Sequence, residues 1–112
     1  MKVSIVRGGG LAGLITKTAA DADLLAPEDA KELRAKVEEA GVFDLPSTLT
    51  TGPPQADRFN YAVTVEDEGR EHTILASEEA LPPSVRSLVS WVKTVPGRED
   101  HVGPPADDLP VA

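Results

Sequence analysis

The chain has 112 residues, which is the size of a single domain, and its formal net charge is -8 at pH 7. Such an acidic surface repels phosphate backbones and anionic lipid headgroups, so we expect no nucleic-acid partner and no membrane partner. Because the sequence contains no cysteine, it excludes disulfides, thiolate metal sites and a cysteine nucleophile.

The first expected element is a β-hairpin. Residues 2–7 alternate polar and apolar side chains, and residues 14–18 form a second β-favouring run. The glycine-rich segment 8–13 between them predicts the turn. A phosphate-binding loop would need a helix directly after the glycines, and a glycine-enabled contact with another chain is a third interpretation. The N-terminal apolar run is too short for a signal peptide, which favours a cytoplasmic protein.

A helix is expected over residues 27–40. Pro27 suits a first helical position, and Glu28 and Asp29 suit the positive end of the helix dipole. Gly41 is a natural stop signal. Apolar residues recur at helical spacing, namely Ala30, Leu33, Val37 and Ala40. The next five residues, 42–46, predict a packed connection.

A second hairpin and a second helix follow. Residues 59–65 alternate cleanly, residues 67–69 predict a turn, and residues 71–76 predict the returning strand. The second helix is expected to begin at residues 82–83 and to end before residues 96–97. Its apolar stripe comprises Val85, Leu88, Val89, Val92 and Val95.

The order of elements is therefore ββαββα. It predicts an α+β domain over residues 1–95 with two layers, a four-stranded, mainly antiparallel sheet and two helices on one of its faces. Residues 96–112 are charged and rich in proline and glycine without periodicity, so we expect a disordered C-terminal tail.

The residues give little support to catalysis. The two histidines are His72 on an expected strand and His101 in the expected tail, and neither belongs to a cluster of metal ligands. Adjacent carboxylates on a helix point in different directions and do not converge on a substrate. We therefore expect no enzyme, no metal site and no cofactor. Two functions remain open at this point: a domain that binds and regulates another cytoplasmic protein, and an enzyme that uses scattered carboxylates.

Several segments together resemble the emfourin family, small protein inhibitors of protealysin-like, thermolysin-type zinc metalloproteases of bacteria. The similarity covers about residues 1–95. It rests on residues 6–13, 57–61, 64–67 and 70–73, and on Leu88 and Trp91. The resemblance implies that the partner is a thermolysin-type metalloprotease, whose cleft the inhibitor blocks with neighbouring loops. We expect the chain alone to be a monomer.

Two loops are the candidate protease-binding residues. Thermolysin-type enzymes prefer a bulky apolar side chain just after the cleaved bond, so an inhibitor needs an exposed apolar residue on a loop that resists cutting. The first loop comprises Asp23, Leu24, Leu25, Ala26 and Pro27, and the second comprises Gly52, Pro53, Pro54, Gln55, Ala56 and Asp57. In the first loop, either one leucine packs in the core while the other is the anchor, or both pack in the core.

The second loop owes its stiffness to its prolines, and a stiff loop loses less entropy on binding. The alternative interpretation is that this loop only connects its neighbouring elements. We hypothesise that the start of the first helix and the start of the third strand lie at the same end of the domain. We expect an ion pair of Asp57 with Arg7 or Arg58 to fix these loops, and direct contact with the protease is the alternative role of these residues. The catalytic zinc is either bound by Asp21 or Asp23 or simply covered, and we favour coverage.

Overall fold

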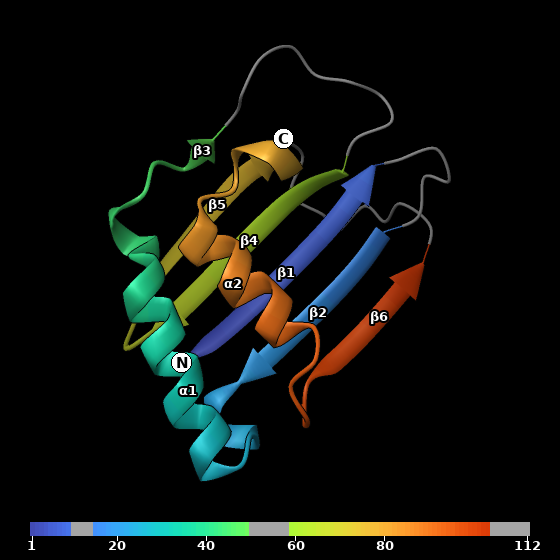
Figure 1. Ribbon diagram of the computed structural model, residues 1–112. Helices are drawn as coiled ribbons and strands as arrows, with labels where there is room; N and C mark the ends of the chain where they lie inside the picture. The colour runs from blue at the N-terminus through green and yellow to red at the C-terminus, as the bar shows by residue number, and fades with distance from the viewer. Residues whose placement is uncertain (10–14, 50–58, 104–112) are drawn as a thin grey trace.

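Strand β1 (Lys2–Gly9) lies inside a six-stranded sheet in the order β3-β5-β4-β1-β2-β6 (Figure 1). This computed structural model describes residues 1–9, 15–49 and 59–103. The other strands are β2 (Ile15–Asp21), β3 (Thr48–Leu49), β4 (Phe59–Asp67), β5 (Arg70–Ser77) and β6 (Glu99–Gly103). All neighbouring pairs are antiparallel except β3 and β5, which are parallel.

The α+β fold class is confirmed, with two strands more than predicted. The four expected strands form the contiguous block β5-β4-β1-β2. The short strand β3 extends this block beside β5, where the backbone N–H of Leu75 donates to the carbonyl of Ser47 at 2.8 Å. On the opposite edge, β6 pairs with β2. The sheet is therefore mixed but mostly antiparallel.

Helix α1 (Pro27–Ala40) has the predicted bounds. Pro27 occupies the first turn, and Gly41 ends the helix in the left-handed region, with φ 61°. There the N–H of Gly41 donates to the carbonyls of Val37 and Glu38, which would otherwise have no partner at the helix end. Helix α2 (Pro83–Val92) starts as predicted but ends earlier than expected, and Val95 remains buried in the turn that follows.

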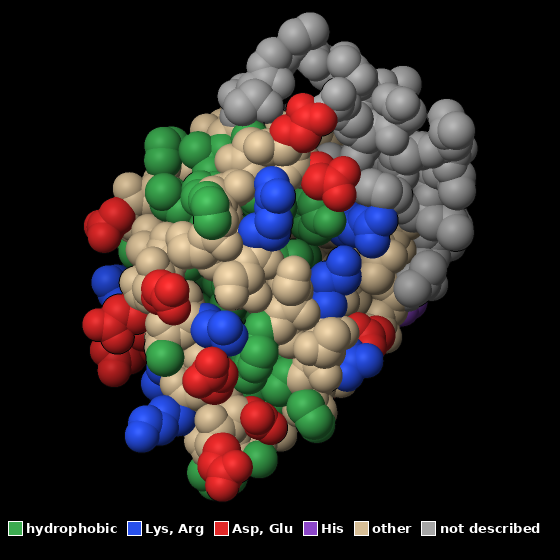
Figure 2. All heavy atoms as spheres, viewed as in Figure 1, with side chains coloured by type: hydrophobic (Ala, Val, Ile, Leu, Met, Phe, Trp, Pro, Cys, Tyr) green, Lys and Arg blue, Asp and Glu red, His purple; other side chains and the backbone are tan. Residues whose placement is uncertain are grey.

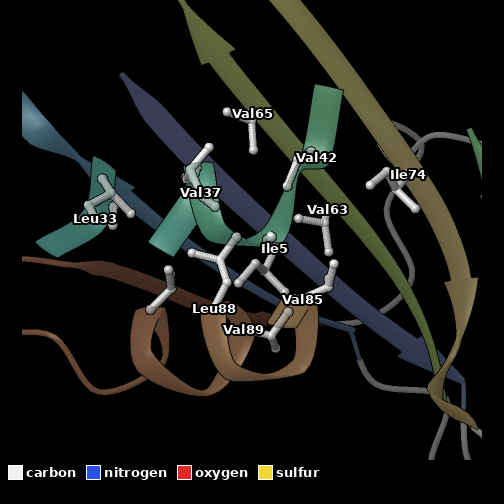
Figure 3. Packing of buried hydrophobic residues seen from close by; sticks show 14 of the residues in the cluster. Ile5, Leu33, Val37, Val42, Val63, Val65, Ile74, Val85, Leu88 and Val89 are labelled. Atoms are coloured by element: carbon white, nitrogen blue, oxygen red, sulfur yellow. The ribbon is translucent and has the colours of Figure 1, made fainter. Parts of the chain in front are cut away.

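Both helices cover one face of the sheet, and the core lies between the two layers (Figure 1). Figure 3 shows side chains from α1 and α2 pointing toward side chains from β1, β4 and β5. The predicted apolar stripes of both helices are buried. The connection after α1 also packs into this core through Val42, as predicted.

The expectation of a disordered tail from residue 96 is wrong for β6. Strand β6 pairs along β2, with Glu99 opposite Ala19 and Gly103 opposite Ile15. The free edge of β2 supplies unpaired backbone donors and acceptors, and β6 satisfies them without needing an apolar alternation of its own. Residues 104–112 lie outside the described residues.

Two glutamates face each other directly across strands β4 and β5. Glu66 and Glu71 are register partners, and like charges in this position are unfavourable. A hydrogen bond to the Glu66 side chain, and then repulsion from its charge, raise the pKa of Glu71. Protonation of Glu71 is therefore easier in the folded chain than in the unfolded chain.

We expect Leu33→Ala to lower the free energy of unfolding by about 2–5 kcal/mol, because Leu33 is fully buried and truncation leaves a cavity. Lys31→Ala, on the exposed side of the same helix, is the control and should change stability by no more than about 0.5 kcal/mol. Urea denaturation measures both. Equal effects of the two variants would contradict the described packing of α1.

We expect Glu71→Gln to raise the melting temperature at pH 7. Since the pKa of Glu71 is higher in the folded chain than in the unfolded chain, its favourable contribution is present at low pH and is lost as pH rises through the raised pKa. The gain should therefore shrink below the usual glutamate pKa of about 4.3. Melting curves across this range test it, and a gain independent of pH would contradict the Glu66–Glu71 repulsion.

Candidate functional site

Leu24 and Leu25 lie in the segment that connects β2 to α1, and they have opposite environments. The 3₁₀ helix η1 (Ala22–Leu24) begins directly after β2. Leu25 is only 9% exposed and belongs to the core, whereas the side chain of Leu24 is 65% exposed. Leu24 stands out as the exposed large hydrophobic residue within the described part of the chain. Of the two alternatives for these leucines, the structure therefore shows one in the core and one at the surface.

One side-chain and two backbone hydrogen bonds hold this turn. Oδ1 of Asp21 accepts from the backbone N–H of Asp23 at 3.0 Å, which caps η1. The N–H of Ala22 donates to the carbonyl of Met1 at 2.9 Å, which ties the turn to the start of β1. The N–H of Leu25 donates back to the carbonyl of Ala22 at 3.4 Å. Leu24 is thus presented from a fixed backbone.

The other three residues of the first candidate loop surround Leu24 on the surface. Asp23, Ala26 and Pro27 are all exposed. Ala26 has an extended backbone with no side-chain cap, and its carbonyl accepts from the N–H of Ala30 at 2.8 Å as α1 begins. Pro27 fixes the first turn of α1, where a missing N–H costs nothing. Hence Asp23, Leu24, Ala26 and Pro27 form one exposed turn, which Leu25 anchors from below.

The end of the molecule that carries this turn is rich in carboxylates. Figure 2 shows acidic and hydrophobic side chains together at the lower end of the view, where η1 leads into α1. A groove of about 380 Å³ lies between the turn and the β4–β5 hairpin. Its lining residues are Met1, Lys2, Asp21, Asp23, Glu66, Asp67, Glu68, Gly69, Arg70 and Glu71. The described residues contain no group of three or more His, Asp or Glu side chains that could hold a metal ion.

The second candidate loop, Gly52, Pro53, Pro54, Gln55, Ala56 and Asp57, lies outside the described residues, as does Arg58. Its described neighbours nevertheless show where it begins and ends. Phe59 pairs with Gly9, and Leu49 reaches the same end of the sheet through its partner Ala76. Asp21, in contrast, pairs with Lys2 at the other end of β1.

The two candidate loops therefore do not start from the same end of the sheet, and the same-end hypothesis is wrong. Lys2 and Gly9 are separated by about 23 Å along β1. Helix α1 causes this separation, because its 14 residues carry the chain about 21 Å from one end of the sheet to the other. The start of α1 and the start of β4 consequently lie at opposite ends.

The two histidines both lie on strands, His72 on β5 and His101 on β6. Nε2 of His72 lies 2.8 Å from the carbonyl of Leu45, so its N–H donates there and fixes the connection between α1 and β3. His101 is exposed on β6, where it pairs with Lys17 in register, and not in a disordered tail. Neither of the two described α-helices is long and apolar enough to cross a lipid bilayer.

The sequence reasoning missed one part of this surface, the turn that precedes β6. A Cβ added at Gly97 would lie 3.2 Å from Cδ2 of Leu25 and 3.4 Å from the carbonyl oxygen of Leu24. Gly97 therefore lies directly against the Leu24 turn. The Pro96–Gly97 pair was the available signal, since it indicates a defined turn as readily as the end of order.

Comparison with known proteins identifies the chain. A family model described as Emfourin matches residues 5–93, which is most of the chain and includes η1 and both helices. No curated protein and no solved structure matches it. The chain therefore belongs to the Emfourin family, known protein inhibitors of protealysin-like metalloproteases, and is an inhibitor and not an enzyme.

Proposed function

We propose that the chain inhibits a protealysin-like metalloprotease by seating the Leu24 turn in the substrate cleft, so that Leu24 fills the apolar subsite beside the catalytic zinc. The observation that carries this proposal is the 65% exposure of Leu24 on a turn whose backbone is hydrogen-bonded on both sides. An enzyme that prefers a bulky apolar side chain after the cleaved bond offers a matching pocket for this leucine.

The backbone of the turn explains how it would bind without being cut. A protease needs its substrate extended through the cleft, whereas the Asp23–Leu24 bond lies within η1. Extending it would break the hydrogen bond between Asp21 and Asp23 and pull Leu25 from the core. Because the free turn already has its bound shape, little conformational entropy is lost on binding. The same stiffness favours tight association and slow cleavage.

Steric coverage of the zinc fits this turn better than ligation by Asp21. One carboxylate oxygen of Asp21 already accepts the N–H of Asp23, so turning it toward a metal would remove the cap of η1. Asp23 is exposed and its carboxylate lies next to Leu24, which leaves it at the edge of the contact. We propose that the turn blocks the cleft by occupying it, with the surrounding end of the domain covering the approach of substrate.

The proposal uses only the end of the domain that carries Leu24. The segment from Gly52 to Asp57 remains a sequence prediction, and its described neighbours belong to the opposite end. A single turn entering a cleft therefore does not bring both loops to the zinc. The hydrogen bonds that hold the Leu24 turn form within the chain, so the turn needs no second copy to keep its shape. We therefore also propose that the monomer is the inhibitory form.

We expect Leu24→Ala to weaken inhibition about tenfold to a hundredfold, because burying a leucine side chain contributes about 1.5–3 kcal/mol. Folding should be unaffected, since Leu24 is exposed. Lys31→Ala, on the exposed face of α1, is the control and should inhibit normally. Inhibition constants against a protealysin-like enzyme measure the effect.

The opposite end of the domain supplies the outcome that would contradict this proposal. If Leu24→Ala inhibits as the native chain does while Gln55→Ala weakens inhibition, the cleft receives the other end of the molecule. Circular dichroism of each variant shows that the comparison concerns folded protein.

We expect Asp21→Ala to make the inhibitor easier to cut at the Asp23–Leu24 bond, because it removes a cap that contributes about 0.5–2 kcal/mol. Lys31→Ala, on the exposed face of α1, is the control, since it leaves the cap and the residues beside the Asp23–Leu24 bond unchanged. Mass spectrometry after incubation with excess protease locates and times the cleavage. Equal lifetimes of the two variants would show that the cap does not protect the turn.

A further inference from the structure

The turn before β6 packs against the Leu24 turn through the backbone of Gly97. Gly97 has φ 88°, a conformation that residues with a side chain rarely adopt. The position of an added Cβ, 3.2 Å from Cδ2 of Leu25, leaves no room for a larger residue without a shift. Val95, two residues earlier, is buried in the core, while Pro96 and Gly97 are exposed. The turn therefore has an anchored base and an accessible tip beside Leu24.

Three side chains fix this turn, and we call Thr18, Arg98 and Asp100 the clamp. The hydroxyl of Thr18, which is only 3% exposed, donates to Oδ1 of Asp100 at 3.1 Å. Nε of Arg98 forms an ion pair with Oδ2 of Asp100 at 2.9 Å. The guanidinium of Arg98 also donates to the carbonyl of Val95 at 3.1 Å. Asp100 thus joins the 95–98 turn to the buried side of β2.

Strand β6 keeps the clamp in register. Asp100 lies opposite Thr18, and its neighbour Glu99 lies opposite Ala19 with its side chain on the other face of the sheet. Both β6 and the 95–98 turn lie beyond residues 5–93, the part of the chain that the Emfourin family model matches. Arg98 and Asp100 of the clamp therefore lie outside the part of the chain that the family match covers, whereas Thr18 lies inside it.

We propose that the 95–98 turn is a second segment of the protease-binding surface, which the clamp positions beside Leu24. This inference rests on the proposed function of Leu24. The exposed Pro96 and Gly97 add a narrow, uncharged surface next to the leucine, which suits the wall of a protein cleft. Because the clamp holds the 95–98 turn in place before binding, and this turn packs against Leu25 through Gly97, it lowers the entropy lost on association.

The clamp is tested first with Asp100→Ala, with Glu99→Ala as the matched control from the same strand. Asp100→Ala should raise the hydrogen-exchange rate of the Leu25 amide in the free protein and weaken inhibition, each about tenfold. Glu99→Ala should change neither quantity. NMR measures the exchange rate of the Leu25 amide in the absence of protease, and inhibition constants measure the affinity for the protease. An unchanged Leu25 exchange rate in Asp100→Ala would overturn the role of the clamp.

The contact of the turn with Leu25 is tested with Gly97→Ala, with Gly41→Ala as its control. Both glycines have positive φ, 88° and 61°, so both variants carry a backbone cost. A Cβ at Gly41 meets nothing within 4 Å, whereas one at Gly97 presses on Leu25. At equal folded fraction, Gly97→Ala should inhibit more weakly than Gly41→Ala.

The outcomes separate this inference from the proposal on which it rests. If Leu24→Ala weakens inhibition but Asp100→Ala and Gly97→Ala do not, the 95–98 turn is not part of the binding surface, and only this inference is overturned. If Leu24→Ala also leaves inhibition unchanged, the proposed use of the Leu24 turn is itself wrong.

Discussion

The double pairing of β1 decides which turns of this protein can act together. Strand β1 is hydrogen-bonded to β2 on one side and to β4 on the other, and both registers run along most of its length. Through Lys2, the end of β2 and the end of β4 lie at the same end of the sheet. The start of β4 lies at the other end, opposite Gly9. The Leu24 turn consequently shares its end with the β4–β5 hairpin and the 95–98 turn.

Two consecutive residues at this end, Leu24 and Leu25, have different roles, since one is exposed for binding and the other stabilises the core. Leu25 is buried with the core that α1 and α2 form over the sheet, while Leu24 projects into solvent. Any movement that extended the backbone at Leu24 would also disturb Leu25, so the free energy that holds the core also resists extension of the turn. Three further contacts add to this rigidity. Asp21 caps η1, the carbonyl of Met1 accepts from Ala22, and Gly97 packs against Leu25. An inhibitor that occupies a protease cleft depends on such resistance.

The sequence was sufficient for the elements whose signals are local. Periodicity predicted both helices and the four strands β1, β2, β4 and β5. The start signal at Pro27 and the stop signal at Gly41 predicted the bounds of α1. Strands β3 and β6 were not predicted because each is stabilised mainly by hydrogen bonds to the edge strand beside it. The Pro- and Gly-rich sequence around β6 is also typical of disorder. The sequence left open whether one leucine of the first loop is exposed or neither is, and only the tertiary environment shows that Leu24 is the exposed one. The ends of the sheet were misjudged because α1 reverses the direction of the chain over the length of a strand.

The most direct test of the central claim is a crystal structure of the chain bound to a protealysin-like metalloprotease. We expect the side chain of Leu24 to occupy the apolar subsite beside the catalytic zinc, with η1 intact and the 95–98 turn against the wall of the cleft. A complex in which the Gly9 and Phe59 end of the sheet faces the zinc, and Leu24 remains in solvent, would contradict the claim.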